Sequence, residues 1–373
     1  MVGRAPIPMR SEHHETVIPF QGLSDLQKVE AKARAQLGAK GLFAKYSFKD
    51  IIAVSKSMKE VLTKAKKFSR AHAAVLIEGE TGTGKELMAQ SIHNESPLKE
   101  GPFVAINCAA LPENLLESEL FGYEEGAFTG AKKGGKPGLF ELAHNGTLFL
   151  DEVGETSPNI QGRLLRALQE KEVMRVGGDK VINVNVRVVA ATNKNMFKMV
   201  RDGLFRNDLY FRLNLLTLHM PPLRQRIQDI PILAQYFLSQ YCEQYQRGSL
   251  AFSAESIKML QDHQWPGHVG ELETCVGRSV VLCDPGQDIN EWLRDSVGEQ
   301  ARHFQETDVD DGVGEDRLAV SLAPMKDMQQ QIINQLMKRH EGNKTRVAEI
   351  LGMSRVTLWK NQKEGENGKA CEN

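Results

Sequence analysis

Residues 79–86, GETGTGKE, have the types and spacing that bind the phosphates of a nucleotide. The strand-like stretch AAVLIE precedes them and the helical stretch ELMAQSIH follows. Backbone N–H groups at the start of such a helix surround phosphate oxygens, and a lysine reaches the outer phosphates. We therefore predict a phosphate-binding loop in place of a chance glycine-rich turn. It consists of Gly79, Glu80, Thr81, Gly82, Thr83, Gly84, Lys85 and Glu86.

Two details of the glycine-rich segments qualify this prediction. The general pattern ends in a Ser or Thr that binds magnesium, whereas Glu86 stands at that position here. The stretch GAKKGGKP, residues 130–137, has the same spacing, but Pro137 follows its lysine and no strand-like run precedes it. We reject this second stretch as a phosphate site, because nothing would place a helix N-terminus there.

Two acids follow the apolar run TLFL, so they would lie at the carboxyl end of a strand. Nucleotides bind at that edge of a parallel sheet. Asp151 would hold magnesium through water, and Glu152 would orient or deprotonate the attacking water. The alternative is an acidic turn after a buried strand. Asn193 ends another apolar run, VVAATN, from which its amide could sense the γ-phosphate.

Arg206 and Arg212 lie in the segment LFRNDLYFRLN, residues 204–214. One interpretation is structural salt bridges. The other is neutralisation of charge on a transferring phosphoryl group, which arginines often perform from a neighbouring subunit.

The elements that must position these groups alternate from residue 47 to about 220. Strand-like runs at 73–78, 103–107, 146–152 and 184–192 are separated by helical stretches such as 159–170. This alternation predicts a parallel sheet covered by helices. After the break at Pro221 and Pro222, residues 221–297 are predicted to be helical throughout.

Composition narrows the class of protein. The chain has 373 residues, 41% hydrophobic and 25% charged, as is ordinary for a soluble globular protein. Its apolar runs are too short to span a membrane. Its five cysteines are scattered without a CxxC pair, which favours reduced thiols in the cytoplasm over a disulfide framework or zinc site.

The formal net charge of −1 hides an uneven distribution. Residues 297–317 hold seven acids and two bases, whereas residues 338–363 hold seven bases and two acids. A small basic terminal unit indicates nucleic acid as a partner, although basic helical pairs are also common solvent-facing surfaces.

Residues 343–363, NKTRVAEILGMSRVTLWKNQK, predict a helix-turn-helix. Asn343 caps the first helix, Val347, Ala348 and Leu351 face inward, and Gly352 makes the turn. The second helix would offer residues to the major groove of double-stranded DNA, and these are Ser354, Arg355, Thr357, Lys360 and Asn361.

Together these motifs resemble the sigma-54-dependent transcriptional activators, which are ring-forming AAA+ ATPases. GETGTGKE, NCAALPENLLESELFG, GAFTGA, GTLFLDE and FRNDLYFRLN occur here in the family's order. The similarity covers about 47–297 and resumes in the C-terminal unit. It implies an α/β fold: an AAA+ P-loop domain with a parallel sheet, a helical lid and a small all-α Fis-type helix-turn-helix.

The resemblance also implies roles for individual residues. Lys85 and its loop would bind ATP, Asp151 and Glu152 would form the Mg²⁺ and catalytic pair, and Asn107 would hold the catalytic glutamate in check. Arg206 and Arg212 match the arginines that, in the family, reach into the nucleotide site of the next subunit. The segment 172–186 resembles the hairpin that supports the GAFTGA loop, and this loop would contact sigma-54 through Gly126, Ala127, Phe128, Thr129, Gly130 and Ala131.

The expected function is that of a cytoplasmic activator with no membrane partner. It would bind enhancer DNA as a dimer, assemble into a ring that is hexameric by resemblance, and remodel the sigma-54 RNA polymerase complex by ATP hydrolysis. The alternative is a DNA-bound regulator that binds nucleotide with little turnover. Gly270 favours this alternative, because the family has a phosphate-sensing arginine there; either His268 or Arg278 replaces that arginine or the contact is missing.

The expected domains are an N-terminal linker (1–46), the ATPase core (47–220), the lid (221–297), an acidic linker (298–320) and the DNA-binding unit with its tail (321–373). Within the N-terminal linker a helix is predicted from Ser24 to about Leu37. It would either pack on its own protein or belong to a signalling or dimerising segment. Residues 40–53 resemble the junction after a sensor domain in propionate-catabolism regulators, so the chain is either a fragment or a natural form without its sensor.

Overall fold

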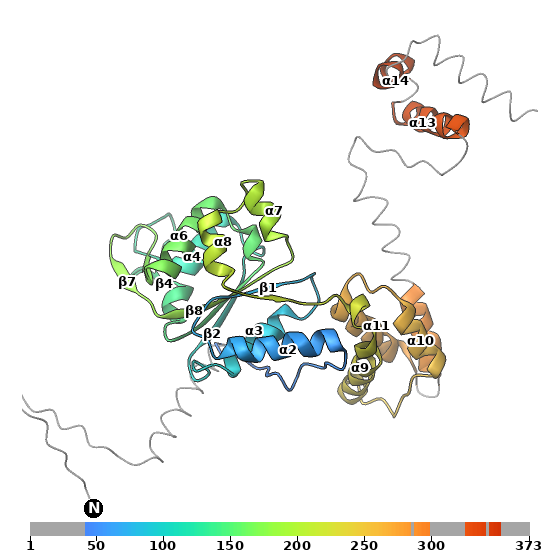
Figure 1. Ribbon diagram of the computed structural model, residues 1–373, viewed down its shortest axis with the longest axis horizontal. Helices are drawn as coiled ribbons and strands as arrows, with labels where there is room; N and C mark the ends of the chain where they lie inside the picture. Colours follow the sequence, from blue (N-terminus) through green and yellow to red (C-terminus); the bar gives the residue numbers. More distant parts are fainter. Residues whose placement is uncertain (1–41, 285–286, 299–324, 341–342, 352–373) are drawn as a thin grey trace, which may run out of the picture. The chain divides into compact units, whose positions relative to one another are not determined.

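The computed structural model describes residues 42–284, 287–298, 325–340 and 343–351 (Figure 1). The chain divides into two compact units, with the boundary after Arg294. Among the described helices, none has both the length and the apolar character needed to cross a membrane. The predicted helix that begins at Ser24 lies outside the described residues.

A five-stranded sheet organises the first unit. Its strands lie in the order β2 (Phe103–Asn107), β5 (Gly146–Asp151), β8 (Val186–Thr192), β1 (Val75–Glu78) and β9 (Leu216–His219). Every neighbouring pair is parallel, which confirms the predicted sheet. All five carboxyl ends therefore meet at one edge, where Asn107 pairs with Asp151 and Glu78 pairs with Thr192 and His219.

Helices cover both faces of this sheet, and strand residues alternate between the two cores. Val75 and Ile77 pack on the side of α2 (Lys56–Ser69) and α3 (Lys85–Asn94), whereas Leu76 packs on the opposite side. That opposite side is covered by α4 (Glu113–Phe121), α5 (Leu139–Leu142), α6 (Pro158–Gln169), α7 (Met196–Arg201) and α8 (Asn207–Leu213) (Figure 1). The strands are apolar along both faces because neither face meets water.

Two small hairpins project from the second of these faces. The strand β3 (Gly122–Tyr123) pairs with β4 (Lys136–Pro137), and β6 (Glu172–Met174) pairs with β7 (Val181–Asn183). The second pair confirms a hairpin within the predicted segment 172–186. Lys136, the lysine of the rejected phosphate pattern, lies in β4 and forms an ion pair with Glu119 at 2.6 Å.

The lid begins with the short 3-10 turns η2 (Leu223–Gln225) and η3 (Ile227–Asp229). It continues with α9 (Ile230–Gln244), α10 (Ala254–Asp262), α11 (His268–Leu282) and a helical stretch that begins at 289. The prediction that 221–297 is helical throughout is wrong in detail, because residues 247–253 and 264–265 carry neither helix nor strand. Trp265 fills one of these breaks, fully buried, and its indole donates to the carbonyl of Leu260 at 2.7 Å.

The second unit contains α13 (Met325–Arg339) and α14 (Lys344–Ile350). Asn343 caps α14, as predicted, because its side-chain oxygen accepts a hydrogen bond from the backbone N–H of Arg346 at 3.2 Å. Val347 and Ala348 are buried against α13, which confirms their predicted inward orientation. The expected base-reading residues Ser354, Arg355, Thr357, Lys360 and Asn361 lie outside the described residues.

The core contains one histidine that should make folding sensitive to acid. His93 is buried, and its Nδ1 lies 2.8 Å from the hydroxyl of Thr147. Burial, with a smaller contribution from nearby Arg187, lowers the pKa of His93 to about 4. The unfolded chain therefore takes up a proton below about pH 6.5, before the folded chain can. Stability is fully present above that pH and falls as the pH drops towards 4.

We expect the free energy of unfolding to fall by about 2 kcal/mol between pH 7.5 and pH 5 because of this one group. His93→Gln, even if less stable overall, should lose this part of the pH dependence, as measured by thermal unfolding at both pH values. The matched control His72→Gln removes an exposed histidine and should keep the full pH dependence. Identical pH dependence in the wild type and His93→Gln would contradict the assignment.

Candidate nucleotide-binding site and its attached loop

The predicted phosphate loop joins β1 to α3 at the carboxyl edge of the sheet. Gly82 and Gly84 have φ angles of 86° and 99°, in the left-handed region that favours glycine. Gly84 is the N-cap of α3, so the first backbone N–H groups of that helix face the loop's interior. Lys85 is only 7% exposed, and its Nζ donates to the carbonyl of Gly79 at 2.9 Å. This arrangement can hold an anion.

The two acids at the end of β5 have different surroundings. The carboxylate of Glu152 lies 3.4 Å from the Nζ of Lys85, and its other oxygen accepts the backbone N–H of Asn193 at 3.0 Å. Glu152 itself adopts a left-handed backbone with φ 49°, which is uncommon for a residue other than glycine. Burial, and then the charge of Glu152, raise the pKa of Asp151. A cation beside Asp151 would relieve both effects.

Three other polar residues of the predicted site, Asn107, Asn193 and Glu86, have identifiable partners. The amide of Asn107 lies 3.5 Å from Asp151, a long hydrogen bond, so this structure does not place it on Glu152 as the resemblance implies. The amide of Asn193 donates to the hydroxyl of Thr81 in the phosphate loop at 3.1 Å. Glu86 accepts a hydrogen bond from Gln90 one turn along α3 at 3.0 Å. The described residues contain no cluster of three or more ligating side chains that could hold a metal by themselves.

An open hollow of about 470 Å³ adjoins the loop at the ends of β1, β8 and β9. It is lined by Glu78, Gly79, Glu80, Asn193, Lys194, Asn195, Phe197, Tyr210, His219 and Met220. Its place at the carboxyl edge is where open α/β sheets bind their ligands.

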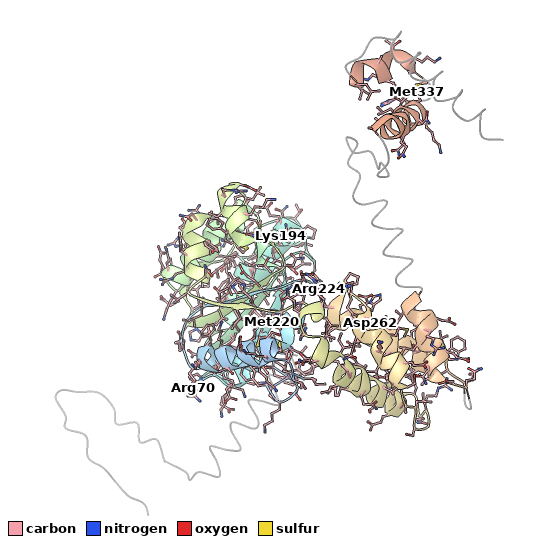
Figure 2. The ribbon with its side chains drawn as sticks, turned by 45° about the vertical axis from the view of Figure 1, so that its right-hand side comes forward. Arg70, Lys194, Met220, Arg224, Asp262 and Met337 are labelled. Atoms are coloured by element: carbon pink, nitrogen blue, oxygen red, sulfur yellow. The ribbon has the colours of Figure 1, made fainter. Side chains whose placement is uncertain are left out.

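The lid contacts the phosphate loop directly. Arg224 binds both oxygens of Glu80, at 2.6 and 3.0 Å, and His268 lies 2.9 Å from the same carboxylate. These contacts, chiefly the hydrogen bonds from Arg224, lower the pKa of Glu80 to about 2. The backbone N–H of Val269 donates to the carbonyl of Gly82 at 3.1 Å. Figure 2 shows Arg224 where the core meets the lid.

The tautomer of His268 follows from its two partners. The backbone N–H of Leu223 points at Nδ1 at 3.3 Å, so Nδ1 accepts and Nε2 carries the hydrogen that is donated to Glu80. Burial lowers the pKa of His268, which also favours this neutral form. The ring is therefore engaged with the protein and supplies no cation in place of the missing arginine. A side chain at Gly270 would meet open space, and Arg278 lies two turns further along α11.

Sequence reasoning included Glu80 in the loop but missed its lid partners. An acid inside a phosphate loop repels an anionic ligand, so a cationic partner must offset its charge. The presence of Glu80 in the loop could therefore have indicated such a partner. The partners themselves lie 144 and 188 positions away in the chain.

The two predicted finger arginines lie on the surface. The guanidinium of Arg206 pairs with Asp208 at 2.7 Å, and Arg212 donates to the carbonyl of Leu168 at 3.5 Å. Within the described ranges, neither contacts the phosphate loop of its own chain. The helix α8 that carries Arg212 packs on α6, and Gln161 of α6 accepts the backbone N–H of Arg206 at 2.9 Å.

The GAFTGA segment is an exposed loop between β3 and β4. Gly126 and Gly130 have φ angles of 81° and 97° in open surroundings, so backbone conformation, not crowding, favours glycine there. Phe128 is 45% exposed, and its ring meets the edge of Tyr123 with centroids 4.9 Å apart. The apolar tip is thus partly covered by its own stalk.

The supporting hairpin contacts the base of this loop. Val176 exchanges backbone hydrogen bonds with Gly122 and Glu124, at 2.9 and 3.0 Å. A side chain at Gly177 would come within 2.8 Å of Ala127, so only a glycine permits this approach. Arg175 binds Glu141 at 2.8 Å and Glu124 at 3.3 Å. These contacts attach the loop's stalk to β6.

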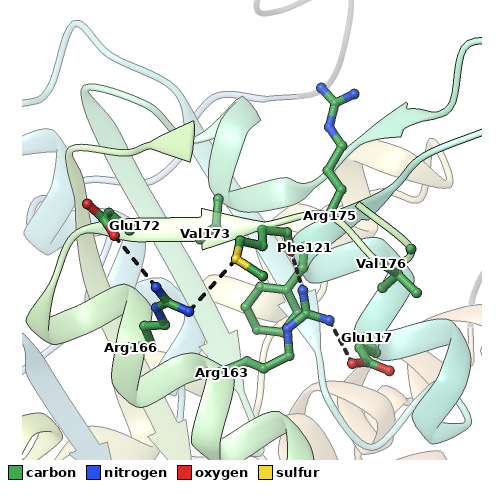
Figure 3. A pocket seen from close by; sticks show the side chains of 10 residues that line it. Glu117, Phe121, Arg163, Arg166, Glu172, Val173, Arg175 and Val176 are labelled. Carbon is green, nitrogen blue, oxygen red and sulfur yellow. Dashed lines mark hydrogen bonds and ion pairs between the residues drawn. The ribbon is translucent and has the colours of Figure 1, made fainter. Parts of the chain in front are cut away.

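A cavity of about 360 Å³ lies between α4, α6 and β6, next to the contacts of Val176 and Gly177 with the loop (Figure 3). Arg163 of α6 lies across it: its guanidinium stacks over the ring of Phe121 at 4.2 Å, binds Glu117 at 2.6 Å and donates to the carbonyl of Met174. Since β5, η1 (Val153–Glu155) and α6 follow one another in the chain, α6 connects the acidic pair to the loop's support.

Comparisons with known proteins match all three parts of the chain. Residues 51–219 match the family described as "Sigma-54 interaction domain", and residues 224–308 match "AAA+ ATPase lid domain". Residues 324–361 match "Bacterial regulatory protein, Fis family". This last match includes the residues expected to read DNA.

Curated relatives and a solved structure agree with these matches. The Nif-specific regulatory protein of Herbaspirillum seropedicae is 50% identical over 268 residues, which are 72% of this chain and 49% of that protein. The transcriptional regulatory protein ZraR of Escherichia coli (strain K12) is 42% identical over 308 residues, 83% of this chain and 67% of that protein. The crystal structure of NtrX from Brucella abortus in complex with ATP has a TM-score of 0.63 at 27% identity, covering 91% of this chain and 73% of that one. The chain spans about half the length of several curated relatives that it matches.

The contacts of Glu80 with the lid lead to a prediction about local opening. Glu80→Ala removes the acceptor of Arg224 and of His268, so the start of α11 should detach more often from the phosphate loop. We expect backbone amides of 267–271 to exchange hydrogen about five- to tenfold faster, since charge-assisted bonds at a half-exposed site are lost. Hydrogen exchange with mass spectrometry of the nucleotide-free protein measures this rate.

Glu86→Ala is the matched control for Glu80→Ala. It removes an acid of the same loop whose described hydrogen bond is with Gln90 on its own helix. Its exchange at 267–271 should match the wild type. Equal exchange in all three proteins would show that Glu80 does not hold the lid.

Proposed function

Because the chain belongs to the family of sigma-54-dependent transcriptional activators, we propose that it hydrolyses ATP to remodel the sigma-54 RNA polymerase complex. The observation that carries the proposal is the joining of Lys85 of the phosphate loop to Glu152 at the start of the segment that leads to α6. One set of contacts thus links a phosphate site to the support of the GAFTGA loop.

The residues present fit ATP with Mg²⁺. The loop offers the N-terminus of α3 and the buried ammonium of Lys85, which suit phosphates. Burial and the charge of Glu152 raise the pKa of Asp151 although the cation of Lys85 lies nearby, so a further cation beside Asp151 would be stabilised. One carboxylate together with substrate phosphates and water is a common way of holding Mg²⁺. The similarity to NtrX in complex with ATP supports the same ligand.

When bound, Mg²⁺·ATP would supply the transferable phosphoryl group and the neutralisation of its charge. The chain's own residues do the rest. Lys85 would turn from Glu152 to the phosphates, and Asp151 would hold Mg²⁺ through water. The released carboxylate of Glu152 would orient a water molecule and accept its proton at Oε. Asn193 bonds both Glu152 and Thr81, so it stands where it could sense the γ-phosphate.

We propose that α6 and its contacts transmit the state of the site. Loss of the bond between Glu152 and the backbone of Asn193 would shift the turn that precedes α6. Arg163 contacts α4 and β6 at once, so a movement of α6 would reach both supports of the loop. Phe128 and Thr129 would then leave the shelter of Tyr123 and contact sigma-54 with the other loop residues, Gly126, Ala127, Gly130 and Ala131.

Ring assembly, hexameric by resemblance, is the proposed state for hydrolysis. Arg206 and Arg212 are exposed and would reach the site of the next subunit, where arginine stabilises transferring phosphoryl groups. Large apolar side chains around them are more than half exposed, as a surface awaiting a partner would be, and these are Phe197, Leu204, Phe211 and Leu215.

The Fis-family match supports binding of double-stranded enhancer DNA, as a dimer, by Ser354, Arg355, Thr357, Lys360 and Asn361. We place this activity in the cytoplasm.

The second candidate function is a DNA-bound regulator that binds nucleotide with little turnover. The open surroundings of Gly270 favour it, because no described cation of α11's first turn faces the loop. Under this second function, the arginine that the family has at position 270 would be missing, and no other side chain would take its place at the γ-phosphate.

Two substitutions separate the chemical step from its mechanical use. Glu152→Gln keeps the shape but cannot accept a proton, so hydrolysis should fall at least about a hundredfold while ATP still binds. Thr129→Ala changes only the loop tip and should abolish promoter opening while hydrolysis continues. Phosphate release and open-complex formation on a sigma-54 promoter measure the two outcomes.

Glu155→Gln is the control for the first substitution, since Glu155 pairs with Lys194 on the surface. Its hydrolysis should stay near the wild-type rate. Near-normal turnover in Glu152→Gln would remove Glu152 from its role. If Thr129→Ala loses ATP hydrolysis and promoter opening to the same extent, the loop has a structural role and does not act as the contact with sigma-54.

Gly270→Arg tests the missing phosphate contact. The open position accepts a side chain, and an arginine–phosphate bond is bidentate and charge-assisted. We expect apparent ATP affinity to rise several-fold and ring assembly to strengthen, as measured with a fluorescent nucleotide and by sedimentation. Gly270→Gln is the control, because it removes the helix cost of glycine without adding charge. Equal effects of the two variants would show that the position does not sense phosphate.

A further inference from the structure

The helix α2 presents a strongly basic surface that the proposed ATPase mechanism does not use. Six cations lie on or directly after it and all are exposed: Lys56, Lys59, Lys64, Lys66, Lys67 and Arg70. Glu60 is the only acid of this helix. Within the described part of the chain, none of the six forms an ion pair with an acid. We call these six residues the α2 basic face.

The periodicity of α2 places these charges on one side. Met58, Ala65 and Ser69 are buried against the core. At 100° per residue, the six cations fall within about half of the helix circumference, opposite that buried side. They extend along about 20 Å, since each helical residue adds 1.5 Å. Glu60 lies in the same half of the circumference, so the strip carries six positive charges and one negative charge. A strip of this length with a positive excess can follow a negatively charged polymer.

The helix is held firmly at both ends, so the strip keeps its shape. Ser55 caps the N-terminus and also donates to the buried carboxylate of Asp229 at 2.8 Å. Arg187, buried under the C-terminus, donates to the carbonyls of Ser69 and Phe68, each at 2.8 Å. Lys66 lies over the ring of Phe48 at 5.7 Å. Among the described residues, the side chains of Lys59, Lys64 and Lys67 have no hydrogen-bond or ion-pair partner. The helix backbone is thus ordered before binding, and the entropy lost on binding is that of the lysine and arginine side chains.

We propose that the α2 basic face binds the phosphate backbone of duplex DNA without sequence preference. Besides Thr63 and the acid Glu60, the surface offers the six cations and no exposed apolar anchor, and protein partners depend on such anchors. Non-specific DNA binding, by contrast, is carried by lysine and arginine alone. The Fis-family match places a DNA-binding unit in the same chain, which would raise the local concentration of DNA around α2.

The experiment measures how salt weakens binding of the full-length chain to a random-sequence duplex. Each phosphate contact contributes about 0.9 to the slope of log affinity against log salt concentration. Lys59→Gln, Lys64→Gln and Lys67→Gln, combined in one variant, should therefore reduce the slope by about two to three. These three side chains make no described side-chain contact, so the thermal unfolding midpoint should stay at the wild-type value.

The matched control combines Lys99→Gln, Lys198→Gln and Lys258→Gln, three exposed lysines elsewhere in the first unit. It has the same net charge as the test variant, and we expect it to keep the wild-type slope. Equal slopes for the test variant and the wild type would overturn the proposal. An equal loss of slope in the control would also overturn it, because overall charge would then account for the effect.

An acidic run in the same chain is the rival occupant. Residues 306–316 hold six acids and no base. If that run and not DNA occupies α2, the α2 variant should keep the wild-type slope. The slope should then stay independent of Lys59, Lys64 and Lys67 even after the six acids of the run are neutralised. This result would overturn DNA as the occupant. The ATP hydrolysis rate of the α2 variant should stay unchanged in every case, so failure here is distinguishable from failure of the proposed function.

Discussion

The ion pair between Lys85 and Glu152 is the contact on which the rest of the site depends. Its members are 7% and 13% exposed, so each charge is costly to bury without the other. The pair joins the loop after β1 to the end of β5, across the intervening strand β8. An anion in the loop would compete with Glu152 for Lys85. Under the proposed mechanism, binding of phosphate and release of the carboxylate of Glu152 would then be one event.

The lid also contacts the phosphate loop through a charged pair, between Arg224 and Glu80. Glu80 is an acid in a loop that can hold an anion. Arg224 offsets its charge, and the neutral ring of His268 donates a further hydrogen bond to the same carboxylate. Because both come from the lid, closure of the lid on the loop occurs through protein contacts and needs no phosphate. A chain with an arginine at position 270 could add a contact to the nucleotide itself. In this chain, the described contacts of the lid with the phosphate loop are made to Glu80 and to the loop backbone, and Gly270 offers no side chain to a nucleotide.

Sequence patterns predicted what depends on near neighbours. The parallel sheet follows from apolar runs and the cap at Asn343 from its own turn, whereas the hairpin at 172–186 was expected from the family resemblance. The partner of Asn107 depends on strand register, and the partners of Glu80 depend on how the lid packs on the core. Both bring together residues that are distant in the chain. Asn107 bonds Asp151 because parallel register pairs those two positions. No local pattern encodes that choice between two adjacent acids.

The position of α6 explains how a small change at the acids could become a large one at the loop. Its N-terminus follows the acidic pair, its middle carries Arg163 between α4 and β6, and Gln161 bonds the backbone of Arg206. A rigid helix moves as a whole, so these contacts cannot respond independently. If the proposed roles hold, hydrolysis, the GAFTGA loop and Arg206, which we propose reaches a neighbouring subunit, would therefore be coupled through α6. Arg163, which lies across the cavity and contacts Phe121, Glu117 and Met174, is the side chain that would carry such a movement to α4 and β6.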